Sequence, residues 1–263
     1  MSGMTGDKEK DSARPAIILL ILVILIAVFS LKFGLQTLTW IEAKLWTSDN
    51  PWIATVPKPL PAPATASAQQ KPAQVKAFDY EFNSPWPGNP KIVPSATYVQ
   101  FRYDTGPVIV FYDPESQLDT LGSMKASNPV EYQKFANVFA DKPLNSNFEL
   151  YQDVYDAAPS QFSPLMSTRD ALRGNVLLLW KLSFGFDLPA DGQFYSFDWG
   201  KVRGFQFGDP AKQRPVAVRV FNDRDRQFRF IFTVAAGSNG SVTQDDIDNA
   251  VESVQPEPFE ERP

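Results

Sequence analysis

The side chains of this sequence that could do chemistry are carboxylates, hydroxyls, lysines and arginines, because the chain contains no histidine and no cysteine. This composition excludes thiolate nucleophiles, disulfides, zinc sites built from Cys or His, and catalytic triads that depend on His. No Ser-x-x-Lys or Gly-x-Ser-x-Gly motif is present. We therefore expect no catalytic residue, no cofactor and no metal ion, with a hydrolase built on paired carboxylates as the least favoured alternative.

Three neighbouring acids, Asp245, Asp246 and Asp248, are the closest approach to a metal-ligand cluster. Their oxygens would suit Ca²⁺ or Mg²⁺. They also follow Thr243 at the start of an apolar pattern of helical period, where acids stabilise the first turn of a helix. Helix capping is the favoured interpretation.

Basic residues are frequent in the last third of the chain, on or just before two expected strands and in the turn that joins these strands. If they share one polar face, they could meet an acidic protein, phosphates or lipid head groups. This possible interaction face consists of Lys212, Arg214, Arg219, Arg224, Arg226 and Arg229. The chain as a whole has 25 basic and 30 acidic residues, a net charge of −5, which gives no case for nucleic-acid binding.

An uncharged apolar run from Ala16 to Leu31 (residues 16–31) precedes these elements. A helix over residues 15–38 would be long enough to cross a bilayer of about 30 Å. The bias of Lys and Arg in residues 1–14, which we expect to be a disordered tail, places the N-terminus in the cytoplasm. The sequence thus predicts an uncleaved single-pass anchor in the cell (inner) membrane, with interface residues Lys32, Trp40 and Trp46.

Residues 39–77 are expected to form a juxtamembrane segment and then a Pro/Ala-rich linker. Prolines at 57, 59, 61, 63 and 72 favour an extended polyproline II spacer over helix or sheet. The folded domain is expected over residues 78–255, outside the cytoplasm and periplasmic in location, followed by a disordered acidic tail over 256–263.

Hydrophobic periodicity predicts an α+β domain, an antiparallel meander sheet with packed helices. A hairpin is expected from alternation over residues 97–103 and 108–112, and the meander from alternation between residues 195 and 234. Helices are expected over 115–125, 130–140, 147–157, 168–181 and 243–254. For residues 176–188 the pattern leaves helix and strand both open.

The sequence favours a non-enzymatic accessory or interaction domain, tethered to the bilayer and working with a protein partner at or near the membrane. A small-molecule or lipid-binding module is the alternative. An aromatic-lined pocket would favour that alternative, whereas an exposed apolar or basic patch would favour the interaction domain.

Overall fold

The computed structural model describes residue 23 and residues 33–63, 73–117, 119–184 and 193–256, and the structural statements below concern these residues. They form a mixed α+β fold around a large sheet in which neighbouring strands are antiparallel, except that β1 runs parallel to β7. In spatial order the strands are β1 (Lys58–Pro59), β7 (Phe194–Asp198), β8 (Val202–Phe207), β9 (Val216–Asn222), β10 (Gln227–Val234), β6 (Pro107–Tyr112), β5 (Tyr98–Arg102) and β4 (Lys91–Pro94).

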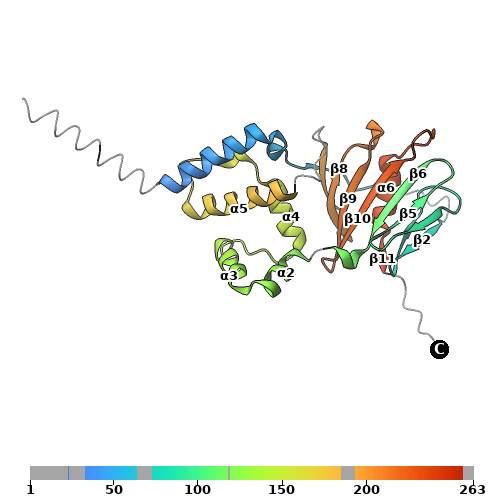
Figure 1. Cartoon of the computed structure of the whole chain (residues 1–263), viewed down its shortest axis with the longest axis horizontal. Coiled ribbons are helices and arrows are strands. Elements are labelled where there is room, and N and C mark those ends of the chain that lie inside the picture. Colours follow the sequence, from blue (N-terminus) through green and yellow to red (C-terminus); the bar gives the residue numbers. More distant parts are fainter. Residues whose placement is uncertain (1–22, 24–32, 64–72, 118, 185–192, 257–263) are drawn as a thin grey trace, which may run out of the picture.

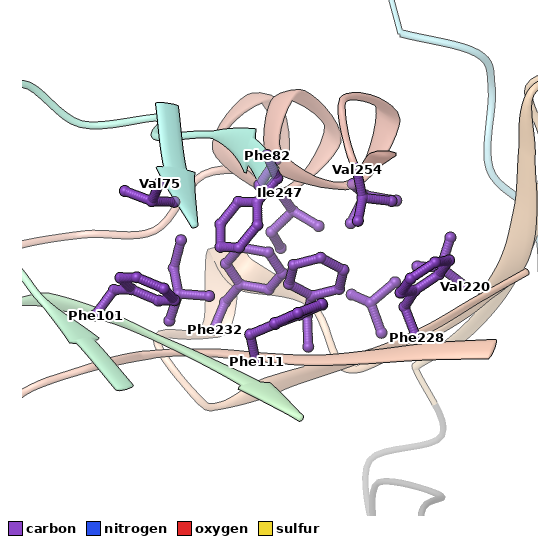
Figure 2. Close-up of a cluster of buried hydrophobic side chains, with 14 of the residues drawn as sticks. Val75, Phe82, Phe101, Phe111, Val220, Phe228, Phe232, Ile247 and Val254 are labelled. Atoms are coloured by element: carbon purple, nitrogen blue, oxygen red, sulfur yellow. The ribbon is translucent and has the colours of Figure 1, made fainter. Parts of the chain in front are cut away.

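One face of this sheet is covered by a small second sheet and the last helix. The second sheet contains β2 (Gln74–Ala77), β3 (Tyr80–Asn83) and β11 (Gln255–Pro256), and the helix is α6 (Gln244–Glu252). Figure 2 shows Phe111 and Phe228 of the large sheet meeting Phe82 of β3 and Ile247 of α6. This first core forms because alternate residues of each strand point to the same face.

The other face is covered at the β7–β9 end by helices (Figure 1). They are residues 33–49, α2 (Thr120–Ser127), α3 (Pro129–Val138), α4 (Asn147–Asp156) and α5 (Thr168–Phe184), with short 3-10 turns η1 (Pro51–Ala54), η2 (Pro114–Ser116), η3 (Pro159–Gln161) and η5 (Pro210–Lys212). Rings of α4 pack directly on the strands, with Tyr155 at 4.8 Å from Phe205 and Phe148 at 5.5 Å from the same ring. This second core is separate from the first because the sheet lies between them.

Most of the expected elements are present. The hairpin is β5–β6, the meander is β7–β10, and α6 begins with a capping box in which Thr243 and Asp246 bond each other's backbone N–H. α5 continues to Phe184, so the first part of the ambiguous stretch is helical, and residues 185–188 lie outside the described residues. The helix expected over 115–125 is wrong in its start, since a turn at η2 comes first and Asp119 caps α2.

The expected juxtamembrane segment and linker are corrected by the structure. Residues 33–49 form a helix whose Ala43 is fully buried in the second core, with Trp40 and Trp46 packed beside it. Gln36 of the same helix is 4% exposed and donates a hydrogen bond of 2.9 Å to Thr168 Oγ1. The folded unit therefore includes residues well before 78, and these tryptophans have packing partners within the protein.

The proline-containing residues 51–59 are also part of the fold. Pro51 occupies the first turn of η1, where a missing N–H costs nothing. Pro59 lies in β1, which is the edge strand of the large sheet and tolerates a residue that cannot donate. Residues 64–72, the middle of the expected linker, lie outside the described residues.

The expected membrane anchor is not supported by the described part of the chain. Within those ranges no helix combines the length and the apolar character that a bilayer crossing requires. The run of residues 16–31, apart from Val23, and Lys32 lie outside them, as do residues 1–14 and 257–263.

Candidate interaction surface

The sheet presents a face that belongs to neither core. Phe101, Phe111 and Phe230 point into the first core, so their neighbours along β5, β6 and β10 point the opposite way. The strand pairing continues this second set of side chains across to β4. We call this surface the open sheet face; it consists of Lys91, Val93, Tyr98, Gln100, Arg102, Val108, Val110, Tyr112, Arg229, Ile231 and Thr233.

The burial of these side chains differs sharply from that of their neighbours. Phe101, Phe111 and Phe230 are 0% exposed, whereas all but one residue of the open sheet face are half-buried or exposed. None of its side chains packs into either hydrophobic core. In Figure 1 helices α4 and α5 lie toward β8, while β10, β6 and β5 extend away from them. A contiguous, partly apolar surface of this kind is typical of a contact site.

Aromatic and guanidinium groups form a row across this face. The rings of Tyr98 and Tyr112 are cross-strand neighbours with centroids 5.8 Å apart. The Arg229 guanidinium lies 5.1 Å from the Tyr112 ring centroid, and Arg219 is the partner of Arg229 on the next strand. Arg219 is 7% exposed and lies 4.3 Å from the Tyr151 ring of α4. The row therefore runs from beneath the helices out onto the open sheet face.

The charges of the open sheet face are all of one sign. Lys91 and Arg102 are exposed and stand opposite each other on β4 and β5, and Arg229 is half-buried. None of the strand residues that form the face is Asp or Glu. The Arg102 guanidinium donates two hydrogen bonds, of 2.7 and 3.1 Å, to Gln100 Oε1, which hold it over the sheet. The face is therefore both basic and aromatic.

The six basic residues expected to share a face are divided among three places. Arg219 and Arg229 are paired across β9 and β10. Arg224 and Arg226 lie in the turn that joins these strands, where Arg226 pairs with Glu115. Lys212 and Arg214 lie at the opposite end of β9. Sequence reasoning missed Lys91, Arg102, Tyr98 and Tyr112, although the alternation of residues 98–102 already carried a signal for Tyr98 and Arg102.

A polar cavity of about 490 Å³ adjoins the β9–β10 turn. It is lined by residues of both charges, including Glu115, Asp119, Arg224 and Arg226. The Asp225 carboxylate beside it accepts hydrogen bonds from the backbone N–H groups of Asn147 (2.6 Å) and Phe148 (3.1 Å). Asp225 therefore satisfies the first two N–H groups of α4, beside the N-cap Ser146, and this accounts for an acid that the sequence placed in a hairpin turn.

Lys181 and Asp156, which lie outside this face, have shifted pKa values. Burial lowers the pKa of Lys181 to about 8, against an opposing effect of Asp156, and its ammonium donates to three backbone carbonyls. Burial, with a further contribution from Asp153, raises the pKa of Asp156. Asp153 itself forms ion pairs of 2.7 Å with Lys142 and Arg173.

The acids considered for a cation site do not converge. Asp246 bonds Thr243 in the capping box, and Asp248 accepts a hydrogen bond of 2.7 Å from Gln244 Nε2. No group of three or more carboxylates that could hold a metal ion occurs within the described ranges. These observations agree with helix capping as the role of this cluster.

Comparisons with protein-family models, with curated proteins and with solved structures give no match to this chain.

Proposed function

We propose that this chain is a non-enzymatic interaction domain that binds a protein partner through the open sheet face. The observation that carries the proposal is the row Arg229–Tyr112–Tyr98, which lies on a sheet face outside both cores. Tyrosine and arginine are the residue types that most often dominate binding energy at protein interfaces. A sheet face that carries such residues suits a macromolecular partner better than a small ligand.

The cavities near this face do not favour the alternative of a small-molecule or lipid-binding module. That function would draw on a concave site lined mostly by aromatic and aliphatic side chains. The cavity at the β9–β10 turn is lined instead by charged and amide side chains. The aromatic rings of α4 that could have lined a pocket are packed against Phe205 and Phe221.

A membrane tether is the second part of the proposal. The uncharged run of residues 16–31 has the composition of a spanning helix, with its polar N-terminal flank on the cytoplasmic side. Such a tether would hold the domain outside the cytoplasm, within reach of partners at the same membrane. Resistance of the full chain to alkaline carbonate extraction, lost when Ile24 and Leu25 are both replaced by Arg in that run, is the expected result.

The interaction function is tested by site-specific photocrosslinking in native membranes. A photoreactive phenylalanine derivative is placed at Gln100, in the middle of the open sheet face, or at Lys212, just before β9 and three strands away from β5. We expect a discrete crosslinked protein from position 100 that is absent from position 212 and is lost on Arg102→Glu. The absence of any product at position 100, or equal products at both positions, would contradict the proposal.

A further inference from the structure

We infer that the partner segment recognised by the open sheet face is acidic and extended, with an apolar or aromatic side chain about four residues from its carboxylates. This inference rests on the proposed function and names the chemistry of the partner. It concerns a polypeptide; a nucleic acid, a lipid surface, the chain's own tail and a second copy of the chain are alternatives that the experiment separates.

The charge of the face is the first reason. The whole chain carries a net charge of −5, yet the strand residues of this face include basic charges and no acid. One like-charged pair of this face stands directly opposite across neighbouring strands, Lys91 with Arg102. Such a pair destabilises a sheet. A carboxylate-bearing partner removes this repulsion and gains charge-assisted hydrogen bonds to the Lys91 ammonium and the Arg102 guanidinium.

The spacing of the chemical groups is the second reason. Arg102 and Tyr98 are four residues apart on β5, a distance of about 13 Å along an extended chain. An extended segment that runs along β5 would place its carboxylates at Lys91 and Arg102 and an apolar side chain against the Tyr98–Tyr112 pair. The Arg229 guanidinium lies beside the Tyr112 ring, and an aromatic side chain of the partner segment would stack on the same group of side chains.

Polypeptide is favoured over nucleic acid by the overall electrostatics. A net charge of −5 and a sequence pI of about 4.9 repel a long polyanion, because its phosphates extend beyond a single face. A short acidic segment meets only the local basic charge. The apolar side chains of the face are also buried or half-buried, whereas a lipid surface is entered by exposed apolar side chains.

The inference is tested by fluorescence anisotropy with the full chain in phosphatidylcholine nanodiscs. The probe is a labelled peptide with two glutamates, a three-residue spacer and a phenylalanine. We expect saturable binding that weakens from about 50 to about 500 mM salt, and that is lost when the glutamates become glutamine. Lys91→Glu combined with Arg102→Glu should weaken binding about tenfold or more, since two ion pairs become repulsive.

The matched control is Lys212→Glu combined with Arg214→Glu, an equal charge change just before β9, three strands away from β5, which should leave affinity within about twofold. Equal binding of the glutamine peptide, or no effect of the Lys91 and Arg102 changes, overturns the inference. So does tighter binding to an oligothymidylate, or to nanodiscs containing phosphatidylglycerol without peptide.

Two further measurements test whether the chain's own C-terminal tail or a second copy of the chain occupies the open sheet face. The sequence after Pro256 contains Glu257 and Phe259, so a variant that ends at Pro256 is titrated in parallel. A marked rise in peptide affinity on this deletion, or dimerisation abolished by Lys91→Glu and Arg102→Glu, would overturn the inference. If position 100 crosslinks to a partner segment that is not acidic, only the inference fails. If position 100 gives no product, the proposed function fails.

Discussion

The ammonium group of Lys181 donates a hydrogen bond of 2.7 Å to the carbonyl oxygen of Thr55, which lies 126 residues earlier in the chain. The same ammonium donates to the carbonyl oxygens of Tyr155 (2.8 Å) and Ala157 (2.7 Å), so all three of its protons are used. Lys181 is fully buried. It joins the segment between η1 and β1, the end of α4 and the last turn of α5 at one point.

Replacement of Lys181 by Met should lower the free energy of unfolding by about 3 kcal/mol, because three buried carbonyls lose their donor. Urea unfolding followed by circular dichroism measures the change. The matched control is Lys201→Met at an exposed lysine, which should alter stability by about 0.5 kcal/mol or less. Equal stability of the two variants would show that Lys181 does not join these segments.

A second prediction concerns the helix of residues 33–49. Ala43→Asp places a carboxylate at a fully buried position of the second core, next to Trp40 and Trp46. We expect a loss of about 3 kcal/mol or more, or failure to fold, because the charge has no partner there. Ile41→Asp, an exposed position of the same helix, should be tolerated. If both variants unfold at the same urea concentration, the helix is not part of the cooperative unit.

The sequence predicted the elements with strong period and clear caps. The recurrence of Val216, Val218 and Val220 at every second position specifies a strand, and Thr243 with Asp246 specifies the start of α6. Residues 51–59 were expected in a linker because proline is compatible both with an extended spacer and with a helix start or a sheet edge. The sequence around Pro59 predicts an extended spacer. Only the pairing of β1 with β7 shows that Pro59 lies at the edge of the sheet.

The candidate surface was only partly predictable from the sequence, because its residues come from strands that are far apart along the chain. Arg219 and Arg229 were singled out by their density of charge, and they are neighbours in space. Lys91 and Arg102 lie more than 100 residues from them along the chain, and their proximity depends on β6 pairing with β10. Long-range pairing of this kind is not encoded in any local pattern, so the face could be assembled only from the fold.

A third prediction concerns the cap of α4. Asp225 has a positive φ of 59° and its carboxylate accepts from Asn147 N and Phe148 N. Asp225→Ala should cost about 2 kcal/mol, since the N–H groups of Asn147 and Phe148 lose their acceptor and Ala is placed in a left-handed conformation. Asp225→Gly keeps the conformation accessible and should cost about 1 kcal/mol. Thermal unfolding distinguishes them, and Asp223→Ala at an exposed position of the turn is the control. A loss as large for Asp223→Ala would contradict the capping role.

The last prediction concerns pH and Asp248 of α6. The pKa of this carboxyl is raised to about 6, chiefly by burial; the hydrogen bond from Gln244 opposes the rise, and the charges of Asp245 and Glu252 add to it. The ordinary value is 3.8, so the folded state binds this proton more tightly than the unfolded state. Stability from this group therefore falls as pH rises from about 4 to about 6, and the loss is complete above pH 6.

Asp248→Asn removes the charge and keeps an oxygen that can accept from Gln244. The variant should be more stable than the parent by about 1 kcal/mol at pH 7.5, with the difference shrinking toward zero near pH 4. Urea unfolding of both proteins across this range measures it, and the difference between them isolates Asp248 from other carboxylates. Asp245→Asn, exposed in the first turn of the same helix, should give no gain at any pH, because an acid there favours the helix dipole. A constant difference between pH 4 and pH 7.5 would mean that Asp248 affects stability through packing and not through its charge.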